Sequence, residues 1–358
     1  MTGSECSLTL FAGVSPVMTY IPAPMRNTFN LSALALVPFL LVAAGCPTDP
    51  AVDTTWREAF DASASGWRMN IWGTSPTDLY SAGGSLAEGV LVRFDGTEGT
   101  EVELPAAFPL LNWTIGFGSD DIHVVGNDGT TLHYDGTTWS VLDSSTDQDL
   151  WGVWGAASND VWAVGGTARA ADGVPTLIHF DGSAWSSVTV PALTPTSVHA
   201  LFKVWGSSAT DVYVVGDSGA VVHYDGSTWE EVLVGAEDDL VAVWGTGPDD
   251  VTMVGGRSNG IAAHWDGTEW RTESLSPLPG LNGVWMREPG VAHIVGLRGT
   301  IIVFDTATFT YEEALPDEVL DYHAVFGIDG ELFAVGGNLA VPSGARGMAW
   351  RRQLAPGE

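Results

Sequence analysis

The sequence predicts an all-β chain, a seven-bladed β-propeller of four-stranded antiparallel blades, and three observations lead to this prediction. Apolar residues show no helical period after Cys46. Runs rich in β-branched and aromatic residues alternate with Asp-Gly and other glycine-containing turns. A Val-Trp-Gly motif or a close variant recurs every 37 to 51 residues, which suits one four-stranded blade per repeat. The aromatic residues of the seven motifs are at positions 72, 117, 154, 205, 244, 285 and 326.

The repeat at residues 204–229 shows the four predicted strands in order. The Asp225-Gly226 pair between two β-rich runs predicts a tight hairpin turn, because glycine supplies the positive φ that such a turn needs. The first strand ends at residues 204–206, the second is residues 212–216, the third is residues 220–224 and the fourth begins at Trp229.

Both faces of the second strand are apolar. Val212 and Val214 point to one side of the sheet, while Tyr213 and Val215 point to the other. A sheet with one face in water would alternate apolar with polar residues. Blades that stack face to face around an axis bury both faces, so this pattern favours a propeller.

The seventh repeat lacks a fourth strand of its own. Its three strands are predicted at residues 322–327, 331–336 and 347–351, near the end of the chain. The segment TTWREAF, residues 54–60, matches the fourth-strand openings TTWSVL and STWEEVL of other repeats. We therefore expect residues 54–60 to complete blade seven and close the ring, which removes an open sheet edge.

The net negative charge of the chain argues against nucleic acid as a partner. The chain has 44 acidic and 13 basic side chains, a net charge of −31, and Lys203 is its only lysine. Such a field repels nucleic acid and anionic lipid headgroups. We expect no nucleic-acid partner, contact with membrane only through a lipid anchor, and a monomer.

Residues 25–46 have the layout of an export signal. Arg26 follows Met25, an apolar stretch covers residues 31–44, and small residues precede Cys46. The Ala43-Ala44-Gly45-Cys46 ending resembles a bacterial lipobox, with alanine in place of leucine. The resemblance implies cleavage before Cys46, lipidation of its thiol, and an outer-membrane lipoprotein that faces the periplasm or the cell surface.

Two alternatives to the lipoprotein stay open. Residues 27–48 are uncharged and could remain as a transmembrane anchor, and ordinary signal peptidase could cut after Ala44 or after Gly45. The predicted organisation is an upstream extension from a misassigned start codon (1–24), a lipoprotein signal peptide (25–45), a lipidated tether (46–53), the propeller (54–352) and a tail (353–358).

The repeats resemble the tandem seven-bladed propeller lipoproteins of myxobacteria-like Gram-negative bacteria. They are more distantly similar to the Asp-box repeats of sialidase-type propellers. The distant likeness rests on YDGTTW, FDGSAW, YDGSTW and WDGTEW, and it extends over residues 54–352. It implies the propeller fold, with the Asp-box turns away from the face that carries activity, and it leaves function open.

The sequence lacks several known catalytic signatures. A sialidase-like site needs three arginines around a carboxylate and a Tyr/Glu pair, and none of the twelve arginines lies in that signature. The acidic pairs Asp238-Asp239 and Glu312-Glu313 are expected to be surface charges. No His-Glu-x-x-His or Walker sequence occurs. The expected function is binding or scaffolding of a protein or glycan at the cell envelope; a glycan hydrolase and a periplasmic membrane-protein assembly scaffold are the alternatives.

Four histidines occupy the same third-strand position in consecutive repeats. Equivalent side chains on neighbouring blades diverge around the ring, so they cannot share one ion. We expect each to be structural, bonded to the adjacent aspartate of the turn or to a neighbouring blade. No metal site or cofactor is predicted; calcium stays open because of the acid-rich linkers, although EF-hand spacing is missing. The four are His133, His179, His223 and His264.

A ligand is expected on the face where second-to-third and fourth-to-first strand connections emerge, because these connections vary while the opposite turns repeat. We call it the variable face; it includes residues 104–111, 165–176, 191–197, 274–281 and 336–347. The predicted contact residues on it are Arg169, Asp217, Arg257, Arg298, Asn338 and Arg346.

Overall fold

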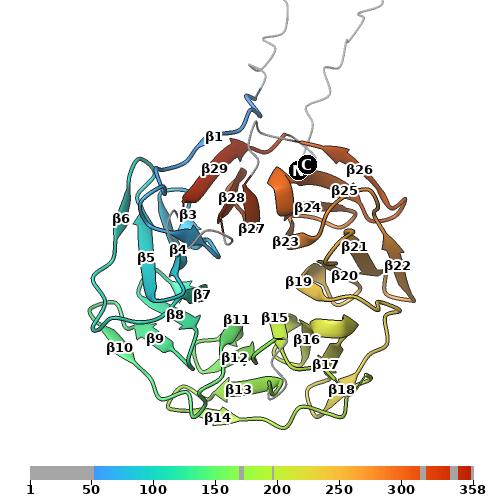
Figure 1. The fold of residues 1–358 in the computed structure, drawn as a ribbon, viewed down its shortest axis with the longest axis horizontal. Helices are drawn as coiled ribbons and strands as arrows, with labels where there is room; N and C mark the ends of the chain where they lie inside the picture. The colour runs from blue at the N-terminus through green and yellow to red at the C-terminus, as the bar shows by residue number, and fades with distance from the viewer. Residues whose placement is uncertain (1–51, 169–172, 196, 315–319, 339–345, 356–358) are drawn as a thin grey trace, which may run out of the picture. The chain divides into compact units, whose positions relative to one another are not determined.

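Seven antiparallel sheets surround a central axis in the computed structural model, which describes residues 52–168, 173–195, 197–314, 320–338 and 346–355 (Figure 1). The fold is therefore the predicted propeller. The export segment with Cys46 lies outside the described residues, as does Arg169. Within the ranges that are described, no helix is long and apolar enough to cross a membrane.

Blades two to six are each a continuous run of four strands, with the first strand innermost (Figure 1). Blade two holds β7 (Leu111–Gly118), β8 (Asp121–Gly126), β9 (Thr131–Tyr134) and β10 (Trp139–Val141). Blade three holds β11 (Leu150–Ala157), β12 (Asp160–Gly165), β13 (Thr176–Phe180) and β14 (Trp185–Ser187). Blade four holds β15 (Leu201–Ser208), β16 (Asp211–Gly216), β17 (Val221–Tyr224) and β18 (Trp229–Glu231). Blade five holds β19 (Leu240–Gly247), β20 (Asp250–Gly255), β21 (Ile261–Trp265) and β22 (Trp270–Ser274). Blade six holds β23 (Leu281–Met286), β24 (Val291–Gly296), β25 (Ile301–Asp305) and β26 (Thr310–Glu313). Short 3-10 turns follow the second strands of blades four and six, η1 (Asp217–Gly219) and η2 (Leu297–Gly299).

Blade one differs because its inner strand is broken in two. Its strands are β2 (Trp67–Arg68), β3 (Trp72–Ser75), β4 (Asp78–Ser85), β5 (Glu88–Phe94) and β6 (Gly99–Glu101), and both β2 and β3 pair with β4. The guanidinium of Arg68 is buried at this interruption of the inner strand. It donates to the backbone oxygens of Ser65, Trp67, Ser81 and Val90 at 2.8 to 3.2 Å, and burial lowers its pKa to about 9.

Blade seven confirms the predicted closure. Its strands are β27 (Asp321–Ile328), β28 (Glu331–Gly337) and β29 (Gly347–Gln353), and β1 (Arg57–Glu58) pairs with β29 as the outer strand. The paired part of β1 is shorter than the predicted 54–60, because the chain after Glu58 turns inward. Phe60 is buried, and its ring lies 5.3 Å from that of Phe94 in blade one. The N-terminal segment thus joins blade seven to blade one.

The Trp-Gly part of the motif packs one blade on the next. A Cβ added to Gly206 would come within 2.6 Å of the Trp154 ring of the preceding blade, which is closer than real atoms approach. Gly206 therefore makes room for the aromatic ring, and the motif aromatic residues serve blade packing. The same contact occurs between Trp72 and Gly116, Phe117 and Gly155, Trp205 and Gly245, and Trp285 and Gly327.

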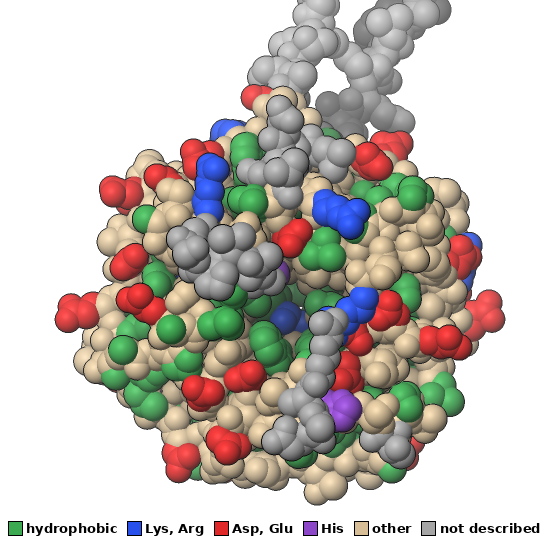
Figure 2. Space-filling view, viewed as in Figure 1, with side chains coloured by type: hydrophobic (Ala, Val, Ile, Leu, Met, Phe, Trp, Pro, Cys, Tyr) green, Lys and Arg blue, Asp and Glu red, His purple; other side chains and the backbone are tan. Residues whose placement is uncertain are grey.

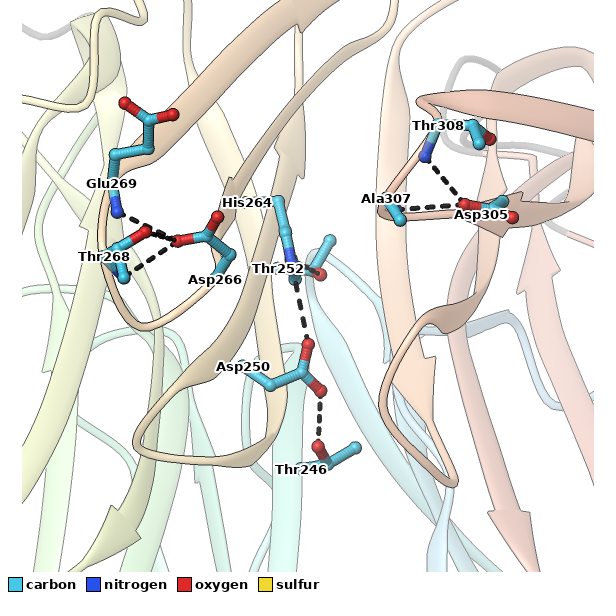
Figure 3. A network of polar contacts seen from close by, with 10 residues as sticks. All are labelled: Thr246, Asp250, Thr252, His264, Asp266, Thr268, Glu269, Asp305, Ala307 and Thr308. Carbon is cyan, nitrogen blue, oxygen red and sulfur yellow. Dashed lines mark hydrogen bonds and ion pairs between the residues drawn. The ribbon is translucent and has the colours of Figure 1, made fainter.

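The Asp-Gly turns have the predicted geometry. The Asp225 carboxylate accepts hydrogen bonds from the backbone N–H groups of Ser227 and Thr228 at 2.8 Å and from the Ser227 hydroxyl at 2.7 Å. Gly226 has φ of 89°, which favours glycine. These bonds lower the pKa of Asp225 to about 2. Figure 3 shows the same arrangement at Asp266, and it recurs at Asp95, Asp135 and Asp181.

Candidate binding site at the central mouth

The first strands of all seven blades line a narrow central channel. Its volume is about 140 Å³, and its walls are mostly apolar. Ile71, Val153, Val204, Val243 and Val284 contribute to the lining.

A wider cavity of about 400 Å³ opens at the variable-face end of this channel, and we call it the mouth. Figure 2 looks onto this face and shows the hollow at its centre, with apolar and basic side chains within it. Every blade contributes a residue from the start of its inner strand. In order of blades, these are Met69, Trp113, Trp151, Lys203, Val241, Asn282 and His323.

Lys203 lies where the mouth meets the channel and lines both. Its Nζ donates to the backbone oxygens of Trp151 at 2.8 Å and Phe202 at 3.2 Å. Nζ also lies 4.1 Å from the centre of the Trp113 ring, a cation–π contact. Burial lowers its pKa to about 7. The base of the mouth therefore holds an amine that exchanges between its protonated and neutral forms near neutral pH.

Asp239, Arg257, His323 and Asp149 are further polar side chains of the mouth. The Asp239 carboxylate accepts the Ser218 N–H at 2.9 Å and forms an ion pair with the Arg257 guanidinium. His323 is buried, and burial lowers its pKa to about 4, so it is neutral at pH 7. The pKa of Asp149 is raised, mainly by burial.

The predicted contact residues do not form one cluster. Arg257 lines the mouth, whereas Arg298 lines a separate hollow on the same face. Asp217 is buried, and both its carboxylate oxygens accept the backbone N–H of His199 at 3.1 Å. This side chain therefore stabilises the connection between blades three and four. The Asn338 N–H donates to the Arg346 backbone oxygen at 3.2 Å, at the base of the loop in blade seven.

Sequence reasoning missed Lys203 as a site residue. A usable signal was present in the repeats. The equivalent position before Val-Trp is Gly152, Ala242 and Gly283 in blades three, five and six. A lysine in place of these small residues, on an inner strand, points into the centre of the ring. Phe202, beside it, also lines the mouth.

The third-strand histidines pair within their own blades, as expected for structural residues. The expected partner was wrong, because the acid is the first residue of the second strand and not the aspartate of the Asp-Gly turn. Strand register explains this, since the second and third strands run side by side at that end of the blade. The pairs are His133–Asp121 at 2.8 Å, His179–Asp160 at 2.7 Å and His223–Asp211 at 2.7 Å.

Comparison with known proteins supports the fold. No protein-family model matches the chain, and no curated protein sequence matches it. The solved structure "YCF48 bound to D1 peptide" is similar, with a TM-score of 0.50 and 16% sequence identity over 71% of this chain and 94% of that chain. At this identity, the likeness extends to the fold alone.

Proposed function

We propose that this chain is a binding propeller of the cell envelope that holds a segment of a protein partner in its central mouth. The observation that carries the proposal is the mouth itself, where an apolar wall lies beside the buried amine of Lys203 and several further polar side chains. Met69, Trp113, Trp151, Phe202 and Val241 form the apolar wall. Recognition sites are typically concave and apolar, with few polar groups that fix the orientation of the ligand.

The chemistry of the mouth favours a protein over a glycan. Sugars require many hydrogen-bonding groups, whereas an apolar side chain of a partner would bury the wall and leave few polar groups unpaired. A protonated Lys203 has three N–H donors and uses two, so one remains for a carbonyl or carboxylate oxygen of the inserted segment. The similar structure was solved with a peptide, which is compatible with this use of the fold.

The charge of the chain suggests the sequence of the partner segment. A net charge of −31 attracts basic groups and repels acidic ones. The proposed ligand is therefore a segment with an aromatic or aliphatic side chain flanked by lysine or arginine.

Peptide and glycan arrays test this proposal. The purified protein is expected to bind peptides with a central tryptophan or leucine and basic flanks, and to bind acidic-flanked versions at least tenfold more weakly. Phe202→Ser in the mouth should abolish binding, while Val141→Ser, on the exposed outer strand β10, should leave it unchanged. Binding of glycans alone, or equal loss in both variants, contradicts the proposal.

The proposed setting is the outer membrane, with the propeller tethered by a lipidated Cys46. The support is the signal-like sequence of residues 25–46. Two or three acyl chains anchor stably where one does not. Mass spectrometry of the N-terminal peptide of protein purified from membranes should find a lipid mass on Cys46, and an unmodified cysteine contradicts the anchor.

A further inference from the structure

Several blades share a pair of side chains, an aspartate on the second strand and a histidine on the third. In blade two this pair has an additional histidine beside it. In blades three and four an aspartate begins the second strand and pairs with a histidine on the third. An aromatic ring two residues after the aspartate packs against this histidine: Trp162 against His179 and Tyr213 against His223, both with ring centres 4.2 Å apart. In blade five a threonine takes this place, and Thr252 Oγ1 lies 3.0 Å from His264 Nδ1 (Figure 3).

Blade two has a second histidine at this place. His123 on β8 stands directly across from His133 on β9, and the two rings stack with centres 4.5 Å apart. Asp121 Oδ1 lies 2.8 Å from His133 Nε2 and 3.6 Å from His123 Nε2. One ligand atom from each of the three residues lies within 4.8 Å of the others. The strand register thus gathers two imidazoles and a carboxylate around one point.

His123 is a buried polar side chain without a hydrogen bond. Its side chain is 1% exposed, and neither ring nitrogen has a hydrogen-bond partner in the described part of the chain. Its neighbours Phe117, Phe180 and Trp185 are aromatic. Buried nitrogens are normally paired, so these two call for an explanation. A metal bond would account for one of them, Nε2, since that nitrogen faces Asp121.

We propose that Asp121, His123 and His133 bind a divalent transition-metal ion of the Zn²⁺ type, with solvent completing its coordination. Bonds of about 2.0 to 2.1 Å in a tetrahedral site place ligand atoms about 3.3 Å apart, and the distances of 2.8 and 3.6 Å to Asp121 Oδ1 lie on either side of this value. Two imidazoles and one carboxylate suit Zn²⁺, Co²⁺, Ni²⁺ or Cu²⁺, whereas Ca²⁺ requires more oxygen ligands.

The surroundings permit an ion to enter. The side chains of Asp121 and His133 are 24% and 25% exposed, so the outer side of the cluster reaches solvent. The ion would join β8 to β9 beside the turn between β7 and β8. This turn lies at the opposite end of the strands from the variable face, so the site does not depend on the proposed function of the mouth.

Cobalt titration tests the site. Untagged full-length protein is treated with chelator, and Co²⁺ is then added in excess Mg²⁺, which occupies carboxylate sites but binds imidazole poorly. Isothermal titration gives the stoichiometry, and visible absorption reports tetrahedral coordination. The wild type should bind one Co²⁺, and Zn²⁺ should displace it.

Blade four supplies matched variants, because Asp211, Tyr213 and His223 repeat the arrangement with tyrosine in place of His123. His123→Tyr should weaken Co²⁺ binding by about 100-fold or more, and Tyr213→His should add a second site. His133→Gln tests the same site without altering the buried position, if His123→Tyr fails to fold. Wild-type protein without tetrahedral cobalt bands, or unchanged binding in both His123→Tyr and His133→Gln, overturns the proposal.

Discussion

Replacement of Lys203 by methionine is expected to stabilise the protein. The side chain sits in an apolar wall, and its pKa falls from an ordinary 10.5 to about 7 because of burial. In the unfolded chain the amine is in water and keeps its proton up to about pH 10. Folding at neutral pH must therefore either bury a positive charge or remove a proton, and both cost free energy.

The size of this cost follows from the two pKa values. A difference of about 3.5 pH units at 1.36 kcal/mol each is on the order of 5 kcal/mol. The two hydrogen bonds of Nζ and its contact with Trp113 offset part of it, at about 1 kcal/mol each. Lys203→Met keeps the apolar stem and loses these contacts, so the net gain should be about 2 kcal/mol.

The gain should depend on pH. Below the folded pKa of about 7 both states of Lys203 are charged, so the penalty is constant. Between about 7 and 10.5 the unfolded chain holds a proton that the folded chain lacks, so wild-type stability rises with pH. The advantage of Lys203→Met should therefore be largest at or below neutral pH and fade toward pH 10.

Urea unfolding followed by tryptophan fluorescence measures both effects. Wild type, Lys203→Met and Lys203→Arg are compared near pH 6 and near pH 10, and near pH 10 the arginine variant should be the least stable because it keeps its charge. The reasoning is refuted if Lys203→Met is no more stable than wild type near pH 6, or if the difference between them is the same at both pH values.

Two further predictions concern closure and the turns. Phe60→Ala should lower the free energy of unfolding by about 3 to 5 kcal/mol in urea, because its buried ring joins the N-terminal segment to blade one; Leu86→Ala, at a 60% exposed position, should change it by less than about 0.5 kcal/mol, and equal effects would argue against closure. The folded pKa of Asp225, about 2 against an ordinary 3.8, means that its carboxylate stabilises the fold above about pH 4 and that this contribution is lost as pH falls toward 2. Melting temperature should therefore fall less steeply over that range in Asp225→Asn than in wild type, and parallel curves would show that the turn contributes nothing.

Blade number, strand order and ring closure were predictable because each depends on local sequence. Asp225-Gly226 forms its turn from bonds within four residues, and Gly206 follows a tryptophan in a motif that recurs. The closing strand was found from its likeness to other fourth strands. The length of the closing strand was not predictable from the sequence. Phe60 turns inward to the ring of Phe94 in blade one, and the sequence pattern does not place these two rings together.

The repeats, the blade faces and the position of the closing strand could be read from sequence pattern, since periodicity and turn chemistry act between near neighbours. The mouth and the histidine cluster depend on contacts between strands, which pattern does not specify. Seven inner strands meet around Lys203 because the ring closes, although they are spread along most of the chain. His123 reaches Asp121 and His133 because β8 and β9 pair in one register, and a shift by one residue would turn its ring to the other face of the blade.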